Sequence, residues 1–224
     1  MLMKAAVLTA AVSLAGAANA AQVFHVTVWT GTPNGILSST TADEAHTPSG
    51  AAIASFDWTG PIDWTVTGAQ NTTTAGNKMG DFLDGNATQL SNLSSALSPA
   101  DFLDVSLSAA GDPYASFFRI TGSYVSATDF HGTISHDDGA SIYLDGANIY
   151  SHPAETSDIS SPYTLTAGSR NFVVDYVEGN GSPSVLTFDA PGGVPEPATW
   201  MMMIAGFGGI GSMLRSRRRA AIAA

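Results

Sequence analysis

The chain has 224 residues, of which 12% are charged, and it contains no cysteine, so disulfides are excluded as a brace for the fold. Residues 21–190 carry 3 basic residues against 18 acidic ones, which gives this segment a net charge of −15. Such a segment repels nucleic acid and anionic membrane surfaces, and we predict no nucleic-acid partner. A bound metal ion could supply part of the bracing that disulfides do not provide.

Residues 1–20 have the features of a secretory signal peptide. Lys4 forms a short positive region, residues 5–18 form an apolar run, and the Ala-Asn-Ala at 18–20 fits the small-x-small rule for cleavage. The alternative is a short buried helix, but this Ala-rich stretch has few large side chains to pack. We therefore predict that the mature protein begins at Ala21.

The first half of the body contains two candidate strands and one candidate helix. Residues 22–30 alternate and are rich in β-branched and aromatic side chains, and residues 51–56 form a second possible strand. Residues 98–103 begin with Ser-Pro and carry an early acid, which predicts a short capped helix. Trp58 and Trp64 flank a Gly-Pro turn; we interpret them as packing residues, the alternative being surfaces on which sugar rings stack.

Short alternating runs separated by turn residues dominate the second half of the body. These runs are 116–121, 130–135, 141–144, 147–150, 163–166, 171–177 and 184–188, the first of which is followed by Gly122. Short strands at a spacing of about ten residues predict an antiparallel sandwich. We predict an all-β fold, an antiparallel β-sandwich over residues 21–190 with one short helix, best supported over 114–189.

Two adjacent acidic residues, Asp137 and Asp138, lie between two of these runs and are followed by Gly139. Neighbouring side chains of an ordinary strand point to opposite faces, so both carboxylates reach one ion only where the backbone departs from a regular strand. The alternative is that Asp138-Gly139 forms a hairpin turn, as we expect for Asp145-Gly146. His136 beside the pair could suggest a transition metal, but the ligand spacing of a zinc site is missing.

Three other carboxylates, those of Asp129, Asp175 and Glu178, are interpreted as solvated or loop residues, any of which could line a binding pocket. The chain has no Cys nucleophile, no G-x-S-x-G, no phosphate-binding loop and no H-E-x-x-H. The only tight acidic pair is adjacent in sequence, unlike the separated carboxylates of glycosidases. We therefore predict that the protein is not an enzyme.

The end of the chain combines a linker, an apolar run and a basic cluster. Residues 191–197 are rich in Pro and Gly, residues 198–214 are uncharged, and residues 215–224 begin with four arginines in five positions. A run of 17 uncharged residues is marginal for a membrane span, which needs about 20. We predict a transmembrane or sorting helix over 198–214 and a basic cytoplasmic tail over 215–224.

This tail closely resembles the PEP C-terminal sorting signal of Gram-negative, exopolysaccharide-producing bacteria. The residues that carry the resemblance are Pro195, Glu196, Pro197, Trp200, Arg217, Arg218 and Arg219. The resemblance implies an exosortase-type membrane enzyme as partner, passage through the inner membrane, and release or transfer to the cell envelope, cell surface or extracellular matrix. The alternative is an ordinary single-span anchor.

The body, chiefly residues 114–189, resembles the protective-antigen-type lectin sandwich that is also found in fungal flocculins and in glycosidase inserts. The match runs through Asp137-Asp138-Gly139 and later through residues 163–168 and 172–179. In that family the adjacent aspartates bind Ca²⁺, often across a cis peptide, so the resemblance implies that Asp137 and Asp138 are calcium ligands. It also implies Asn180 as a third ligand; further candidate ligand-binding residues are His136, Gly139, Ser182 and Ser184.

Two functions from different classes follow. The first is a surface- or matrix-targeted protein that binds an extracellular polysaccharide or other glycan through Ca²⁺, without catalysis. The second is a structural matrix protein in which Ca²⁺ only braces the loops. A glycan-active enzyme is the third and least favoured reading.

Overall fold

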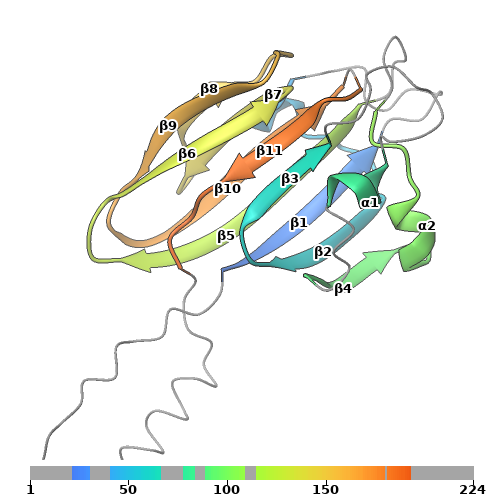
Figure 1. Ribbon diagram of the computed structural model, residues 1–224. Coiled ribbons are helices and arrows are strands. Elements are labelled where there is room, and N and C mark those ends of the chain that lie inside the picture. The colour runs from blue at the N-terminus through green and yellow to red at the C-terminus, as the bar shows by residue number, and fades with distance from the viewer. Residues whose placement is uncertain are drawn as a thin grey trace, which may run out of the picture.

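The computed structural model describes residues 22–30, 41–66, 78–83, 89–108, 115–179 and 181–192. Two antiparallel sheets pack face to face, with two short helices beside one end (Figure 1). The strands are β1 (Val23–Thr30), β2 (Ala54–Thr59), β3 (Ile62–Val66), β4 (Leu90–Ser95), β5 (Ser116–Ser126), β6 (Phe130–Asp137), β7 (Gly139–Leu144), β8 (Ala147–His152), β9 (Ile159–Leu165), β10 (Gly168–Glu178) and β11 (Ser184–Phe188). The helices are η1 (Glu44–His46), α1 (Met79–Phe82) and α2 (Pro99–Leu103).

The predicted antiparallel sandwich is confirmed. The seven-stranded sheet has the order β4-β2-β1-β5-β10-β7-β8, and the four-stranded sheet has the order β3-β11-β6-β9. Every strand pair is antiparallel. Because β1 pairs with β5 and β3 pairs with β11, the N-terminal strands belong to the same two sheets as the rest of the body.

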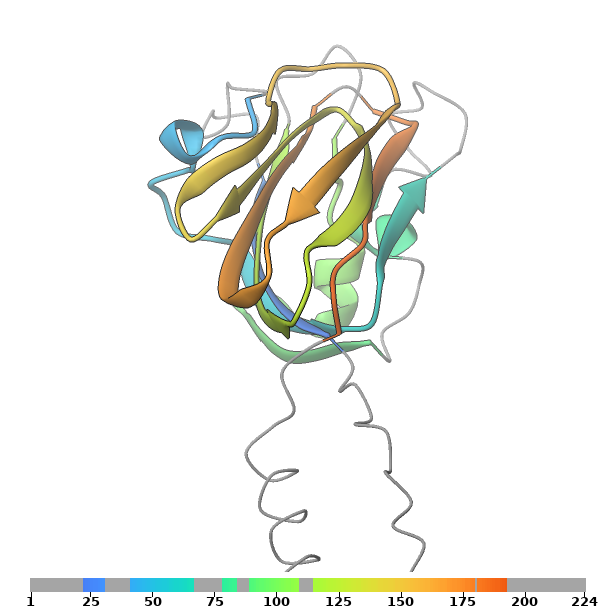
Figure 2. The same cartoon turned by 90° about the vertical axis from the view of Figure 1, so that its left-hand side faces the viewer.

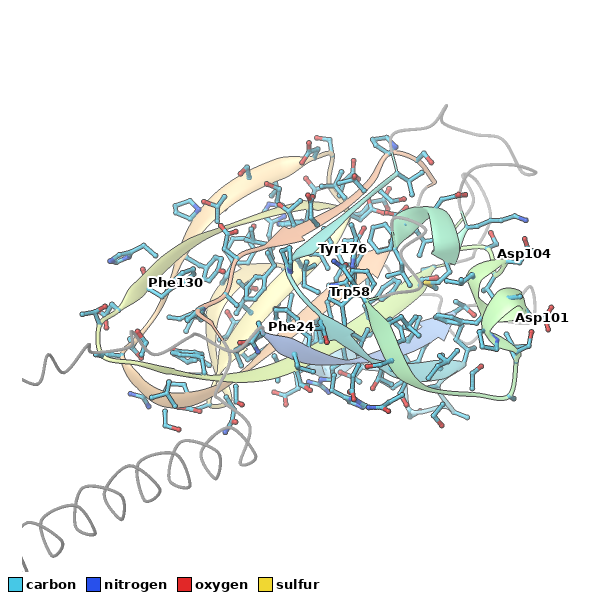
Figure 3. The ribbon with its side chains drawn as sticks, turned by 60° about the horizontal axis from the view of Figure 1, so that its bottom comes forward. Phe24, Trp58, Asp101, Asp104, Phe130 and Tyr176 are labelled. Atoms are coloured by element: carbon cyan, nitrogen blue, oxygen red, sulfur yellow. The ribbon has the colours of Figure 1, made fainter. Side chains whose placement is uncertain are left out.

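Aromatic side chains fill the space between the two sheets. Trp58 and Trp64 meet edge to face with ring centroids 5.3 Å apart, and both are buried, which confirms their interpretation as packing residues. Figure 3 shows Phe24, Trp58 and Tyr176 directed into this layer, whereas Asp101 lies on the outer helix α2. Burial of large rings is the main stabilising contribution that a sandwich of this size can make.

The N-terminal half confirms one local prediction and contains one strand that was missed. The short helix is confirmed as α2, and the Ser98 hydroxyl caps it by accepting from the Asp101 amide at 3.2 Å. Strand β4 was not predicted, because its sequence Leu-Ser-Asn-Leu-Ser-Ser is polar and it lies at the edge of its sheet.

Gly122 was wrongly interpreted as the end of a strand, since β5 continues through it to Ser126. A Cβ at this position would lie 2.5 Å from Cζ of Phe172, which is directly opposite on β10. The glycine therefore makes room for an aromatic ring in the core, which is a common reason for glycine inside a strand.

The chain changes sheets at the aspartate pair. Strand β6 pairs with β9 and β11, whereas β7 pairs with β8 and β10 in the other sheet. The alternative of a hairpin turn at Asp138-Gly139 is therefore wrong. The expected hairpin at Asp145-Gly146 is confirmed, and both residues have positive φ, as a two-residue turn of this type requires.

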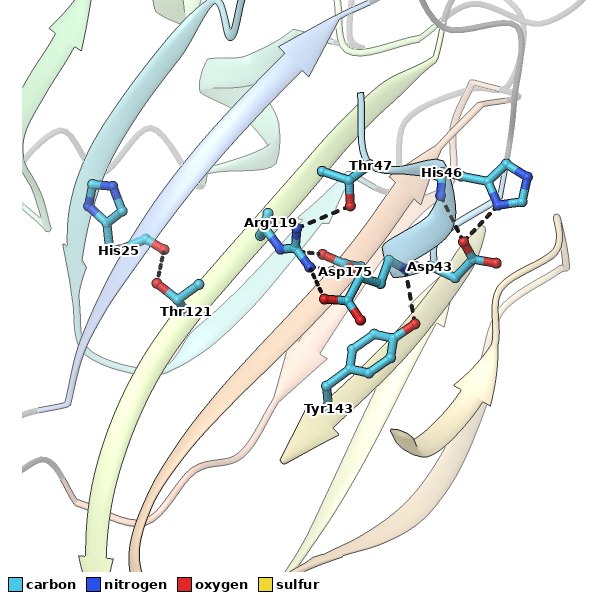
Figure 4. Close-up of polar contacts among 9 residues, drawn as sticks. His25, Asp43, His46, Thr47, Arg119, Thr121, Tyr143 and Asp175 are labelled. Atoms are coloured by element: carbon cyan, nitrogen blue, oxygen red, sulfur yellow. Dashed lines mark hydrogen bonds and ion pairs between the residues drawn. The ribbon is translucent and has the colours of Figure 1, made fainter. Parts of the chain in front are cut away.

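Residues 41–53, which we call the covering segment, cover part of the outer face of the seven-stranded sheet. Here Arg119 of β5 makes an ion pair with Asp175 of β10, with 3.3 Å between Nε and Oδ1, and also contacts Thr47 of the covering segment (Figure 4). Asp175 is fully buried, so its interpretation as a solvated carboxylate is wrong. The Tyr143 hydroxyl accepts from the amide of Glu44 and fixes the segment further along.

The start of β1 and the end of β11 lie at the same end of the sandwich, as Figure 2 shows at the bottom of the view. Gln22 and Gly192 both line one apolar depression there, and the Gln22 carbonyl accepts from the Gly60 amide. The predicted signal peptide and sorting tail lie outside the described residues, as does the predicted helix over 198–214. No helix in the described part of the chain is long and apolar enough to cross a membrane.

Candidate functional site

The aspartate pair opens into a cavity at the end of the sandwich where β6 ends and β11 begins. The cavity has a volume of about 550 Å³ and is lined by Asp137, Asp138, Glu155, Thr156, Ser157, Gly181, Ser182 and Pro183. The end of β6 and the bend after it supply the pair, the loop between β8 and β9 supplies one wall, and the loop before β11 supplies the other. The opening is large enough for a metal ion and part of a small ligand.

Hydrogen bonds orient both aspartates. The peptide between Asp137 and Asp138 is cis, as the family resemblance implied. The Asp137 carbonyl accepts from the Tyr176 hydroxyl at 2.5 Å, and the Asp138 carbonyl accepts from Nδ1–H of His136 at 2.5 Å. Both carbonyls are thus held inside the protein, while both side chains line the cavity.

The two carboxylates are nearly enclosed, with Asp137 8% exposed and Asp138 2% exposed. The Asp137 carboxylate accepts from the backbone amide of Asp158, and Oδ2 of Asp138 accepts from the amide of Gly179 at 2.8 Å. Burial, followed by the negative charges of Asp138 and Asp158, raises the pKa of Asp137 to about 6. Two close, nearly buried carboxylates repel each other, and either a proton or a bound cation relieves that repulsion.

A third carboxylate, that of Glu178, lies behind the pair and is fully buried, so its interpretation as a solvated residue is wrong. Oε1 accepts from the Ser108 hydroxyl at 2.8 Å, and Oε2 lies 3.0 Å from the Tyr176 hydroxyl. Burial and then the charge of Asp138 raise the pKa of Glu178 well above its usual range. The Tyr176 hydroxyl lies between the Asp137 carbonyl and the Glu178 carboxyl, both of which can accept its proton, and links the two groups.

His136 supports the pair from inside. It is fully buried, and its Nε2 lies 2.6 Å from the Tyr150 hydroxyl. Burial lowers the pKa of His136, which favours the neutral ring, and with Nδ1 donating to the Asp138 carbonyl the neutral ring accepts from Tyr150 through Nε2. Because both ring nitrogens are engaged within the protein, we assign His136 to positioning the Asp138 carbonyl and leave it out of the proposed ligand set.

Gly139 allows one wall of the cavity to pack closely. A Cβ on this residue would lie 2.1 Å from the carbonyl oxygen of Pro153, at the start of the loop between β8 and β9. The same carbonyl accepts from the amide of Ala42 at 2.8 Å. The covering segment and Gly139 therefore fix the position of the wall that carries Glu155, so Gly139 acts on the site through the backbone.

The remaining predicted residues are divided between the cavity, the interior and the undescribed part of the chain. Ser182 lines the cavity, and the peptide between it and Pro183 is cis. The Ser184 side chain is buried and hydrogen-bonds to Glu178, away from the cavity lining. Asn180 lies outside the described residues.

All three basic residues between positions 21 and 190 are engaged elsewhere. The ion pairs are Lys78 with Asp104, Arg119 with Asp175, and Arg170 with Asp145. No side chain of the body can therefore serve as a permanent positive partner for the aspartate pair. Within the described residues no group of three or more His, Cys, Asp or Glu side chains has metal-binding geometry. The donor set on offer is two carboxylates with nearby backbone and hydroxyl oxygens, which is the chemistry that Ca²⁺ accepts.

Residues 193–219 match the PEP-CTERM protein-sorting motif. The chain ends in a PEP-CTERM sorting signal. This signal implies export, processing by an exosortase, and sorting to the cell surface or the extracellular space. All of the predicted signal residues, from Pro195 to Arg219, fall inside the matched range. The predicted domain boundaries and the cytoplasmic tail stay predictions.

The body is similar to solved PA14 domains. It matches the PA14 sugar-binding domain from an RTX adhesin with a TM-score of 0.50 and 15% identity, over 75% of this chain and 87% of that one. It also matches the PA14 domain of the MpAFP antifreeze protein (TM-score 0.46, 15% identity, 75% and 78% covered). A third similar structure is epithelial adhesin 9 from Candida glabrata (TM-score 0.40, 11% identity, 74% and 78% covered). None of the curated proteins matches the chain. The fold of the body is PA14-like.

Proposed function

We propose that this exported protein is a Ca²⁺-dependent, non-catalytic carbohydrate-binding protein of the cell surface or extracellular matrix. The observation that carries the proposal is the pair of nearly buried carboxylates, Asp137 and Asp138, which share one cavity while every Lys and Arg of the body is ion-paired elsewhere. A divalent cation would offset both charges at the same time. The calcium dependence, the glycan and the exosortase are all parts of this proposal.

In the proposed site the ion would contact the sugar, and the protein would hold the ion and shape the cavity. Asp137 and Asp138 would hold Ca²⁺, with oxygen atoms from the loop before β11, near Asn180 and Ser182, completing its shell. Ca²⁺ would supply coordination to neighbouring hydroxyl groups of a sugar. The chain's own contribution is to hold the pair rigid through Tyr176 and His136 and to shape the cavity that admits the sugar.

The position of the cavity supports a role in adhesion. The cavity lies at the start of β11, and the last described residues before the sorting signal follow the end of the same strand. A body attached through its C-terminal end would thus present the cavity on the far side, toward an external polysaccharide. The PA14 sugar-binding domain of the adhesin has the same fold, which is consistent with this use of the site.

Isothermal calorimetry with CaCl₂ on the purified protein tests the metal site. We expect a dissociation constant between micromolar and millimolar for the wild type, and loss of the binding heat in Asp138→Asn. Asp63→Asn is a matched control, because Asp63 is an exposed carboxylate on β3 opposite Thr187, near the far end of β11. A wild type that binds no calcium would overturn the proposal.

A glycan array probed with and without EGTA tests the carbohydrate function. We expect retention on at least one class of neutral or amino sugar that disappears with EGTA and in Asp138→Asn. Calcium binding that raises the melting temperature without retention of any glycan would replace this function by the purely structural one, in which the ion braces the loops.

A further inference from the structure

The charge around the cavity restricts which sugars the site can accept. Between positions 21 and 190 the only basic residues are Lys78, Arg119 and Arg170, and each is ion-paired away from the cavity. This holds for the undescribed internal segments as well, because their sequences contain no Lys or Arg. His136, the histidine next to the pair, is buried, and both of its ring nitrogens are hydrogen-bonded inside the protein. No Lys or Arg of the body is therefore available to receive a uronate, sulfate or phosphate group.

The cavity also keeps a negative charge when its metal site is filled. A divalent cation offsets the charges of Asp137 and Asp138. Glu155 lines the same cavity, is exposed, and makes no ion pair within the described residues. Asp158, at the end of the same loop, is close enough to influence Asp137 and is exposed as well. A sugar that coordinates the ion would therefore meet at least one uncompensated carboxylate at the wall.

The wall carrying Glu155 is held in place rather than left as a free loop. Its first residue, Pro153, packs on Gly139 and accepts from the amide of Ala42, and Ala42 is itself fully buried. The Asp158 amide binds the Asp137 carboxylate at the other end of the loop. The loop that carries Glu155 is thus held at both ends, which keeps Glu155 beside the ion site.

We propose that the ligand is a glycan whose sugar units carry a free amino group, of the glucosamine type, with its ammonium group beside Glu155. This inference rests on the proposed calcium-dependent sugar site and names its ligand class. The hydroxyls of the amino sugar coordinate the ion, and the ammonium offsets the charge that the ion leaves uncompensated. Neutral sugars lack the second contact, and acidic sugars are repelled.

The test compares short oligosaccharides of equal length whose sugar units carry a positive charge, no charge or a negative charge. Di- and trisaccharides of β-1,4-linked glucosamine, their N-acetylated counterparts and uronate oligomers of the same length are titrated into the calcium-loaded protein, at a pH where the amine is protonated. Only binding that is lost when calcium is removed is compared between the sugars, because a body with a net charge of −15 attracts any cation weakly. We expect the amino sugar to bind about two- to fivefold more tightly than the acetylated one, and the uronate not to bind.

The variant Glu155→Gln should remove this preference while it still binds calcium, whereas the control Asp63→Asn should keep the preference. Equal binding of amino and acetylated sugars by the wild type, or a preference that survives in Glu155→Gln, would overturn the inference while the calcium-dependent sugar site stands. Failure of the wild type to bind calcium would instead overturn the site itself. The two failures are distinguished by the calcium titration alone.

Discussion

The buried ion pair on the outer sheet face predicts an unusual pH dependence of stability. Asp175 is fully buried beneath the covering segment, and burial, partly offset by Arg119, raises the pKa of its carboxyl to about 7. In the unfolded chain the same group has a pKa near 3.8. The folded state therefore holds this proton over a pH range in which the unfolded state has lost it.

The sign follows from that difference. The contribution of Asp175 to stability is fully present below pH 3.8 and is lost as the pH rises through about 7. Each pKa unit corresponds to 1.36 kcal/mol, so the gap of roughly three units amounts to about 4 kcal/mol. For a domain of this size, about 1 kcal/mol changes the melting temperature by roughly 2–4 °C, which predicts a change on the order of 10 °C.

The assay is the melting temperature of wild type and Asp175→Asn measured by differential scanning calorimetry from pH 4 to pH 8 in EGTA. Other carboxylates titrate in both proteins, so the difference between the two curves isolates Asp175. We expect the melting temperature of Asp175→Asn to increase steadily relative to that of the wild type as the pH rises.

Asp145→Asn serves as the control in the same pH series. The Asn171 amide and then Arg170 lower the pKa of this exposed carboxyl, so its contribution is present above pH 3.8 and lost as the pH falls. The melting temperature of the wild type should therefore increase slightly relative to that of Asp145→Asn as the pH rises. The reasoning would be refuted if the difference in melting temperature between wild type and Asp175→Asn stayed constant with pH. It would also be refuted if the wild type became the more stable of the two as the pH rises, as expected for the control.

Two further predictions concern the core. Trp64→Ala should lower the free energy of unfolding by about 3–5 kcal/mol in urea titrations, against less than about 0.5 kcal/mol for the exposed Val125→Ala; equal losses would contradict the packing described for the aromatic layer. Gly122→Ala should cost about 1–3 kcal/mol because its Cβ meets the Phe172 ring, and a double-mutant cycle with Phe172→Ala should recover much of that cost. Strictly additive effects would show that the two positions do not interact.

Period-two patterning and turn chemistry were sufficient to predict most strands of the second half, the Asp145-Gly146 hairpin and the capped helix after Ser98. They failed where a tertiary contact decided the outcome. Gly122 continues a strand because Phe172 needs the space, and polar β4 is a strand because it completes an edge. Neither the ring opposite Gly122 nor the strand that pairs with β4 can be identified from the local sequence.

In the candidate site, too, local features were predicted from the sequence and features that depend on tertiary contacts were not. The aspartate pair was found from the sequence, but its change of sheets was not, because strand pairing joins residues far apart in the chain. Glu178 could have been found, since it continues the alternation of Val174 and Tyr176 on the inner face of β10. The sequence around Glu155 does not predict that it lines the cavity, because contacts with Gly139 and Ala42, which are distant in sequence, place this loop.

Strand β11 joins the cavity to the last described residues before the sorting signal, and this has a mechanical consequence. Its five residues span roughly 14 Å, with β3 on one side and β6 on the other. A pull between a ligand in the cavity and an attachment point beyond Gly192 would run along the strand. Ladder hydrogen bonds lie perpendicular to that direction, so both ladders would bear the load together in shear, instead of opening one bond after another.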